Sequence, residues 1–161
     1  MPGACGVRRL GRGSMVVLTI GPGDEMAPTH HQKHQAGRHL AVGRALLHGY
    51  DAELAGQRST VTVNGRLAQV QVAAQGDWQI SDVEKYLDAT VAYVVLVDVR
   101  DPSAPGFFMA PGEVARELVR RRRDEFMAAH GDRRPRNPDS KHAKIDPHDV
   151  QSWKDRWDLF Q

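Results

Sequence analysis

The chain has 161 residues, of which 40% are hydrophobic and 26% are charged, a composition typical of one globular domain and unlike that of a disordered or membrane protein. Its formal net charge is only +2, so charge alone does not predict a polyanionic partner. The single cysteine, Cys5, excludes an internal disulfide and favours a reducing, cytoplasmic setting. No apolar run approaches the ~20 residues that a spanning helix needs, so we expect no membrane segment.

The N-terminal segment differs in composition from the rest of the chain. It is rich in Gly, Pro and Arg, and its apolar run from Met15 to Ile20 is too short for an export signal. We expect residues 1–28 to be a disordered extension, or the product of a start codon placed too early. Residues 29–161 are then expected to form a single domain with a basic C-terminal segment.

The first half of the domain predicts a helix followed by short strands. Small and apolar residues recur at helical spacing after Thr29, which predicts a helix from Thr29 to His48, closed by Gly49. The pair Asn64-Gly65 predicts a tight hairpin turn. The strands expected around this turn are Asp51–Leu54, Thr60–Val63 and Leu67–Ala74, with Trp78–Ile80 extending the same sheet and Val83–Leu87 forming a short helix capped by Ser81 or Asp82.

The second half contains the most apolar strand. Ala92–Val99 lacks polar alternation, which indicates a strand buried on both faces at the centre of the sheet. A turn, a strand and a helix follow at Asp101–Gly106, Phe107–Ala110 and Pro111–Ala129. Beyond Gly131 we expect an extended surface segment at Arg133–Lys144, a short helix at Asp146–Ser152, and a tail that packs on the body through Trp153, Trp157, Leu159 and Phe160. This order predicts an α/β fold with a mixed central sheet of about four to six strands flanked by helices.

Polar residues interrupt one face of the predicted hairpin. Side chains two apart on a strand share a face, so Thr60 and Thr62 share one side of their strand, and Gln69 and Gln71 share one side of theirs. Taken alone, this pattern is typical of a half-solvated edge strand.

This hairpin, the preceding helix ending in HGY, and the tail PRNPDSKHAKI…WKDRWDLF resemble small bacterial endonuclease-like proteins of the PD-(D/E)XK class. The resemblance spans about Gln35 to Phe160. It implies a nuclease-type fold with an Asp on the first hairpin strand, and an acid or Gln, any residue, and then Lys on the second. In that class these groups hold Mg²⁺ and activate the attacking water.

The catalytic positions implied by the resemblance are largely substituted. The Asp maps to Thr60, the acid or Gln to Gln69, and the Lys to Gln71, while a further helix acid maps to Arg38 in QAGRHL. Only Gln69 matches an accepted variant. Because neutral Thr and Gln cannot neutralise Mg²⁺, we expect no metal cofactor, no standard hydrolysis and a pseudoenzyme.

The alternative is an active Mg²⁺-dependent endonuclease that hydrolyses phosphodiester bonds at a relocated site. The acids that could serve such a site are Asp51, Glu53 and Asp98. A solvent-facing or strand-end carboxylate is the simpler interpretation of each one.

The C-terminal third is the basic end of the chain. Between Arg120 and Lys144 the chain has nine Lys or Arg residues and only four acids. This excess of positive charge favours contact with a DNA or RNA backbone. The candidate residues are Arg120, Arg121, Arg122, Arg123, Arg133, Arg134, Arg136, Lys141 and Lys144. A solvated helix end accounts for the four consecutive arginines equally well. A third alternative is a structural or protein-interaction role, with a homodimer as one form of it.

Histidines gather at the start of the first predicted helix. His30, His31 and His34 lie close enough to bind a transition metal, because residues four apart share a helix face. A solvated polar helix end is the preferred interpretation, so no metal site is predicted. The sequence contains no P-loop, dinucleotide-binding fingerprint or cysteine-based zinc spacing.

Overall fold

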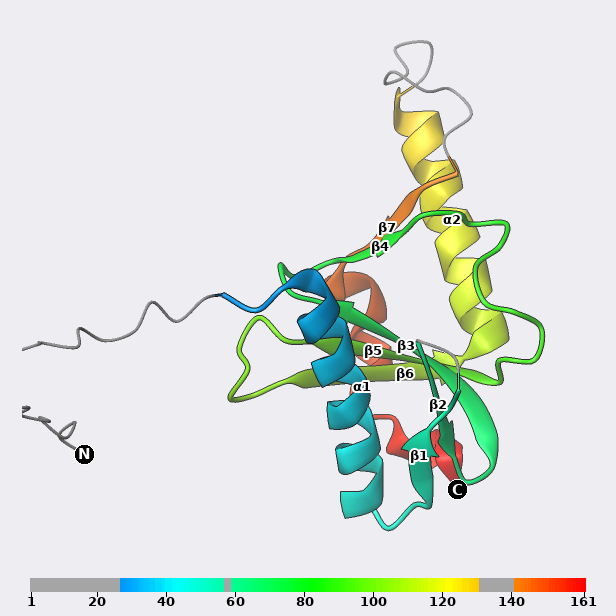
Figure 1. Cartoon of the computed structure of the whole chain (residues 1–161). Helices are drawn as coiled ribbons and strands as arrows, with labels where there is room; N and C mark the ends of the chain where they lie inside the picture. Colours follow the sequence, from blue (N-terminus) through cyan, green and yellow to red (C-terminus); the bar gives the residue numbers. More distant parts are fainter. Residues whose placement is uncertain (1–26, 57–58, 131–140) are drawn as a thin grey trace, which may run out of the picture.

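A computed structural model describes residues 27–56, 59–130 and 141–161. The expectation for residues 1–28 therefore falls almost entirely outside the described residues, as do Arg133, Arg134 and Arg136. The described part of the chain forms an α/β fold in which helices pack on a five-stranded mixed sheet, with a small two-stranded sheet beside it (Figure 1). This confirms the predicted fold class. Within these residues, no helix is both long and apolar enough to span a membrane.

The first helix, α1, runs from His30 to Leu47. The Thr29 hydroxyl accepts a hydrogen bond from the Gln32 backbone N–H, and the Gln32 side chain accepts one from the Thr29 N–H. This reciprocal capping box fixes the start of the helix. At the other end Gly49 has φ of +84°, a left-handed conformation that glycine adopts without strain. The predicted helix and both of its ends are confirmed.

Gly37 lets α1 approach the sheet closely. A Cβ atom at this position would lie 2.1 Å from Cγ2 of Val72, so only hydrogen fits there. The contact holds the first half of α1 against β3 (Arg66–Ala73) and sets the place of its neighbours along the helix.

The main sheet has the strand order β1-β2-β3-β5-β6. β1 (Ala52–Leu54), β2 (Thr60–Val63) and β3 form an antiparallel meander. Asn64 and Gly65 both have positive φ, as the predicted hairpin turn requires. β5 (Tyr93–Asp98) runs parallel to β3, and β6 (Gly106–Pro111) pairs antiparallel with β5.

The two faces of this sheet carry separate hydrophobic cores. Val70, Val95 and Val97 point toward α1, where the C-terminal tail adds Trp157 and Phe160. Leu96 and its neighbours on the opposite face pack against α2 (Gly112–His130). Val94–Val97 are fully buried, as predicted, although β3 rather than β5 takes the middle place in the sheet. The tail ends in two 3₁₀ helices, Pro147–Trp153 and Trp157–Phe160.

Two predictions for the connection between β3 and β5 were wrong. β4 (Trp78–Ile80) does not extend the main sheet but pairs with β7 (Ala143–Ile145), within the segment expected to be extended surface chain. Residues 83–87 form bends, not a helix. The Asp82 carboxylate does accept hydrogen bonds from the next backbone N–H groups, but Leu87 has φ of +61°, which turns the chain away from a helical course.

Candidate functional site

The structure brings together the three hairpin positions singled out in the sequence. Thr60 opens β2 directly opposite Gln69 of β3, and Gln71 follows two residues later on the same side of its strand. The alternate residues Ala68 and Val70 belong to the core beneath α1. Gln69 and Gln71 therefore point to the opposite face of the sheet, the face that carries α2. Along β3 the pairing with β2 ends at Gln69, opposite Thr60. Gln71 therefore lies beyond the last pair of the hairpin.

These three side chains are neutral. Thr60 is 2% exposed and the two glutamines are half-buried. The hydroxyl of Tyr86 donates a hydrogen bond of 2.8 Å to Oε1 of Gln71, and burial raises the pKa of Tyr86. The phenol therefore stays protonated and holds Gln71 in place, while no carboxylate occupies the hairpin positions where Mg²⁺ ligands are expected.

Arg38 is the fourth position implied by the resemblance, and it lies at the same place. Its side chain is 7% exposed, and one terminal nitrogen donates to the carbonyl oxygens of Ala55 (3.0 Å) and Thr60 (3.1 Å). The other donates a longer bond to Oε1 of Gln35. The guanidinium therefore contacts the backbone of Thr60, the position at which the resemblance implies an Asp. A divalent cation placed there would meet this positive charge.

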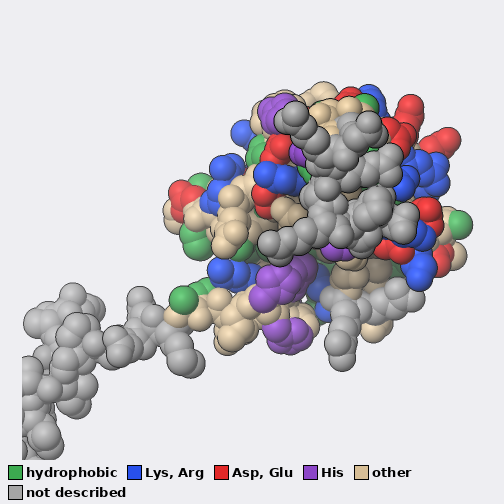
Figure 2. All heavy atoms as spheres, turned by 90° about the horizontal axis from the view of Figure 1, so that it is seen from above, with side chains coloured by type: hydrophobic (Ala, Val, Ile, Leu, Met, Phe, Trp, Pro, Cys, Tyr) green, Lys and Arg blue, Asp and Glu red, His purple; other side chains and the backbone are tan. Residues whose placement is uncertain are grey.

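A pocket of about 400 Å³ lies between the start of α1 and the end of β3. We call it the Lys33 pocket. Histidine side chains gather over the beginning of α1 (Figure 2). The polar and aromatic residues that line this pocket are His30, Lys33, His34, Gln71, Gln75, Asp77, Trp78 and Gln79. It therefore joins one hairpin position, Gln71, to the first turns of α1.

One lysine, Lys33, lines the pocket. Its described acid, Asp77, forms an ion pair of 2.8 Å with Lys144, and the hydrogen bond from Lys144 holds the pKa of Asp77 below its usual value. Burial, aided by repulsion from His30 and His31, lowers the pKa of His34. Lys33 forms no ion pair within the described ranges. The pocket therefore offers one free cation together with imidazole and amide groups.

The three acids considered for a relocated catalytic site, Asp51, Glu53 and Asp98, do not line the Lys33 pocket. The Asp98 carboxylate is held by Nε and a terminal nitrogen of Arg100, at 2.9 and 2.6 Å. Glu53 is exposed on the edge strand β1, opposite Thr62. Asp51 is also exposed, just before that strand.

Several cations of the predicted basic segment already have acidic partners. Arg122 contacts Glu125, Asp146 and Asp149, and Lys144 contacts both Asp77 and Asp146. Lys141 pairs with Glu84, and Arg121 lies 3.8 Å from Glu125. Arg120 and Arg123 form no ion pair in the part of the chain that the structure describes. Of the segment's cations that the structure describes, four therefore have an acidic partner.

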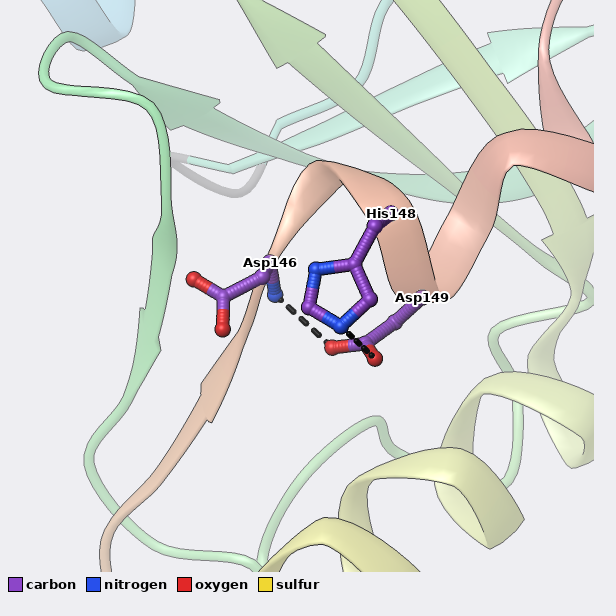
Figure 3. Close-up of side chains that lie close together, drawn as sticks. All are labelled: Asp146, His148 and Asp149. Carbon is purple, nitrogen blue, oxygen red and sulfur yellow. Dashed lines mark hydrogen bonds and ion pairs between the residues drawn. The ribbon is translucent and has the colours of Figure 1, made fainter.

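A grouping that the sequence analysis missed lies at the start of the first 3₁₀ helix. Asp146, His148 and Asp149 lie close together, and one ligand atom of each lies within 4.8 Å of those of the others (Figure 3). Nε2 of His148 lies 3.1 Å from Asp149, and the Asp146 backbone N–H donates to the same carboxylate. Because both aspartates already form ion pairs with Arg122 or Lys144, we interpret this group as an ion-pair network and not a metal centre.

Lys33 was also missed as a site residue. Its spacing from His30 and His34 puts the three on one helix face, a signal present in the sequence. What the sequence lacks is any local sign that this face meets Gln71, which is 38 positions further along the chain. Comparisons of the chain with protein families, with curated proteins and with solved structures found no match.

Proposed function

We propose that this chain is a nuclease-like module that has lost Mg²⁺-dependent catalysis and binds the sugar–phosphate backbone of nucleic acid through the Lys33 pocket. The observation that carries the proposal is that the four motif positions, three of which have lost the expected charge, lie close together, and that one of them, Gln71, lines that pocket. Thr60 and Gln69 are paired across two strands, Arg38 contacts the Thr60 carbonyl, and Gln71 lines the pocket.

The loss of catalysis follows from the charges at these positions. Mg²⁺ is bound in proteins through one or two carboxylates together with substrate phosphates, and Thr60, Gln69 and Gln71 supply none. The buried guanidinium of Arg38 adds a positive charge at the same place. Without metal or lysine, the electrostatic stabilisation of the transferring phosphoryl group is absent, and this is usually the largest catalytic contribution.

The side chains that line the pocket are of the kinds that bind phosphate. Backbone contacts in nucleic-acid complexes come from lysine and arginine together with neutral N–H donors, and the pocket combines Lys33 with imidazoles and the Gln71 amide. The acid that lines it is neutralised by Lys144. Arg120 and Arg123 are further candidates for phosphate contacts. The expectation of a cytoplasmic setting, based on Cys5, agrees with a nucleic-acid partner.

The test is a binding titration of labelled single-stranded and duplex oligonucleotides, read by fluorescence anisotropy at several salt concentrations. Each phosphate contact contributes about −0.9 to the slope of log K against log salt. Lys33→Glu is therefore expected to weaken binding by at least about tenfold and to reduce the steepness of that slope by about 1.

Lys154→Glu is the matched control. Lys154 is exposed, forms no ion pair with a described residue and does not line the Lys33 pocket, and its replacement changes the net charge by the same amount. We expect it to weaken binding by less than about threefold, through long-range charge alone. Equal effects of the two variants, or binding that does not depend on salt, would contradict the proposal.

A further inference from the structure

His30 and His34 form a pair at the start of α1. They are four residues apart on the helix, their ring centroids lie 4.5 Å apart, and the ring planes are tilted by 53°. Both line the Lys33 pocket. The two rings are therefore neighbours on one face of the helix.

The backbone beneath this pair is fixed. The capping box of Thr29 and Gln32 anchors the first turn, and Gly37 seats the helix against Val72.

We propose that His30 and His34 bind a divalent transition cation of the class that prefers imidazole, represented by Zn²⁺, within the Lys33 pocket. Imidazole suits Zn²⁺, Cu²⁺ and Ni²⁺, whereas Mg²⁺ prefers oxygen ligands. Two histidines fill two of the four positions that Zn²⁺ takes, which leaves the others to water or to an anion in the pocket. The metal site shares its imidazoles with the proposed nucleic-acid site but needs no phosphate and none of the hairpin positions, so it is tested in the absence of nucleic acid.

Among the residues that the structure describes there is one competing group, Asp146, His148 and Asp149. Its carboxylates are already engaged by Arg122 and Lys144, so a cation there must displace two ion-paired side chains. The His30 and His34 rings form no ion pair within the described residues. A titration with variants of each group therefore separates the two locations.

The experiment is a calorimetric titration of the full chain with Zn²⁺ in the absence of nucleic acid. We expect one Zn²⁺ per chain, and a loss of affinity of at least about tenfold for His30→Ala and for His34→Ala. His39→Ala, on the same helix but exposed and outside this pocket, and His148→Ala should each change the affinity by less than about twofold. Unchanged binding in the first two variants, or loss of binding in His148→Ala, would overturn the proposal, as would a failure of Zn²⁺ to bind.

A second readout places the ion independently of any change in stability. Trp78 lines the Lys33 pocket, whereas Trp157 packs against His48 at the opposite end of α1. Paramagnetic Ni²⁺ added in place of Zn²⁺ should therefore broaden the indole N–H signal of Trp78 and leave that of Trp157 sharp. Broadening of Trp157 alone, or equal broadening of both signals, would place the ion elsewhere.

Discussion

Arg38 is a charged side chain held almost entirely inside the fold, with backbone carbonyls as its main partners. Its guanidinium donates to the carbonyl oxygens of Ala55 and Thr60, which flank the connection between β1 and β2. Burying a cation without a carboxylate is costly. We propose that its hydrogen bonds to these two carbonyls offset this cost, at the position where the resemblance implies an acid.

Replacing Arg38 with methionine tests this role. The Ala55 and Thr60 carbonyls would each lose a donor, so we expect the free energy of unfolding to fall by about 1–3 kcal/mol, measured by urea denaturation. Arg44→Met is the control, because Arg44 is exposed on the same helix, and it should change stability by less than about 0.5 kcal/mol. An Arg38→Met variant that is as stable as the native chain would show that the cost of burying the charge outweighs its hydrogen bonds.

The charge at Arg38 could be read from the sequence, but its contacts could not. The resemblance placed a cation at the position of an expected acid, and the structure puts that cation against Thr60. The partner carbonyls are 17 and 22 residues away along the chain. Backbone carbonyls of this kind leave no trace in the residue types of a sequence.

The packing of α1 on β3 is the element contact that builds the Lys33 pocket. It depends on Gly37, where an added methyl group would lie 2.1 Å from Val72 Cγ2. Valine is stiff about its first side-chain torsion, so it cannot simply turn away. Two glycines on the same helix therefore have opposite roles, because Gly43 has nothing within 4 Å of such a group.

We predict that Gly37→Ala lowers the free energy of unfolding, because overpacking costs about 1–3 kcal/mol and exceeds the gain in helix propensity of about 1 kcal/mol. Gly43→Ala should instead stabilise the chain by about 0.5–1 kcal/mol. Thermal and urea unfolding of both variants would decide this. Adding Val72→Ala to Gly37→Ala should recover part of the loss, and a stabilising effect of Gly37→Ala alone would contradict the close contact.

Elements set by local signals were predictable, and those set by distant partners were not. The Thr29 cap and the Asn64-Gly65 turn depend on neighbouring residues, and both were confirmed. β4 was assigned to the main sheet because its partner, β7, lies more than 60 residues later in a polar segment. The helix expected at residues 83–87 had a capping residue, but the left-handed backbone of Leu87 carries no signal in a leucine.

At the scale of the whole molecule, the charge distribution in space differs from that along the chain. The sequence concentrates cations between Arg120 and Lys144, yet Arg122, Lys141 and Lys144 are tied to acids from other elements. Those pairs depend on tertiary packing and could not be read from residue order. The absence of carboxylates at Thr60, Gln69 and Gln71 needed only the sequence and the resemblance, and the structure adds that these positions lie together.

The most direct test of the account incubates the native chain with supercoiled plasmid DNA at low salt in Mg²⁺ or Mn²⁺, with and without a chelator. Electrophoresis before and after removal of the protein reads binding and cleavage in the same samples. The variant Thr60→Asp/Gln71→Lys, run beside the native chain, restores the missing acid and lysine. The account predicts that the native chain retards the DNA and leaves it intact. Formation of nicked or linear DNA by the native chain that the chelator prevents would contradict the loss of catalysis. DNA that is not retarded at all would contradict nucleic-acid binding.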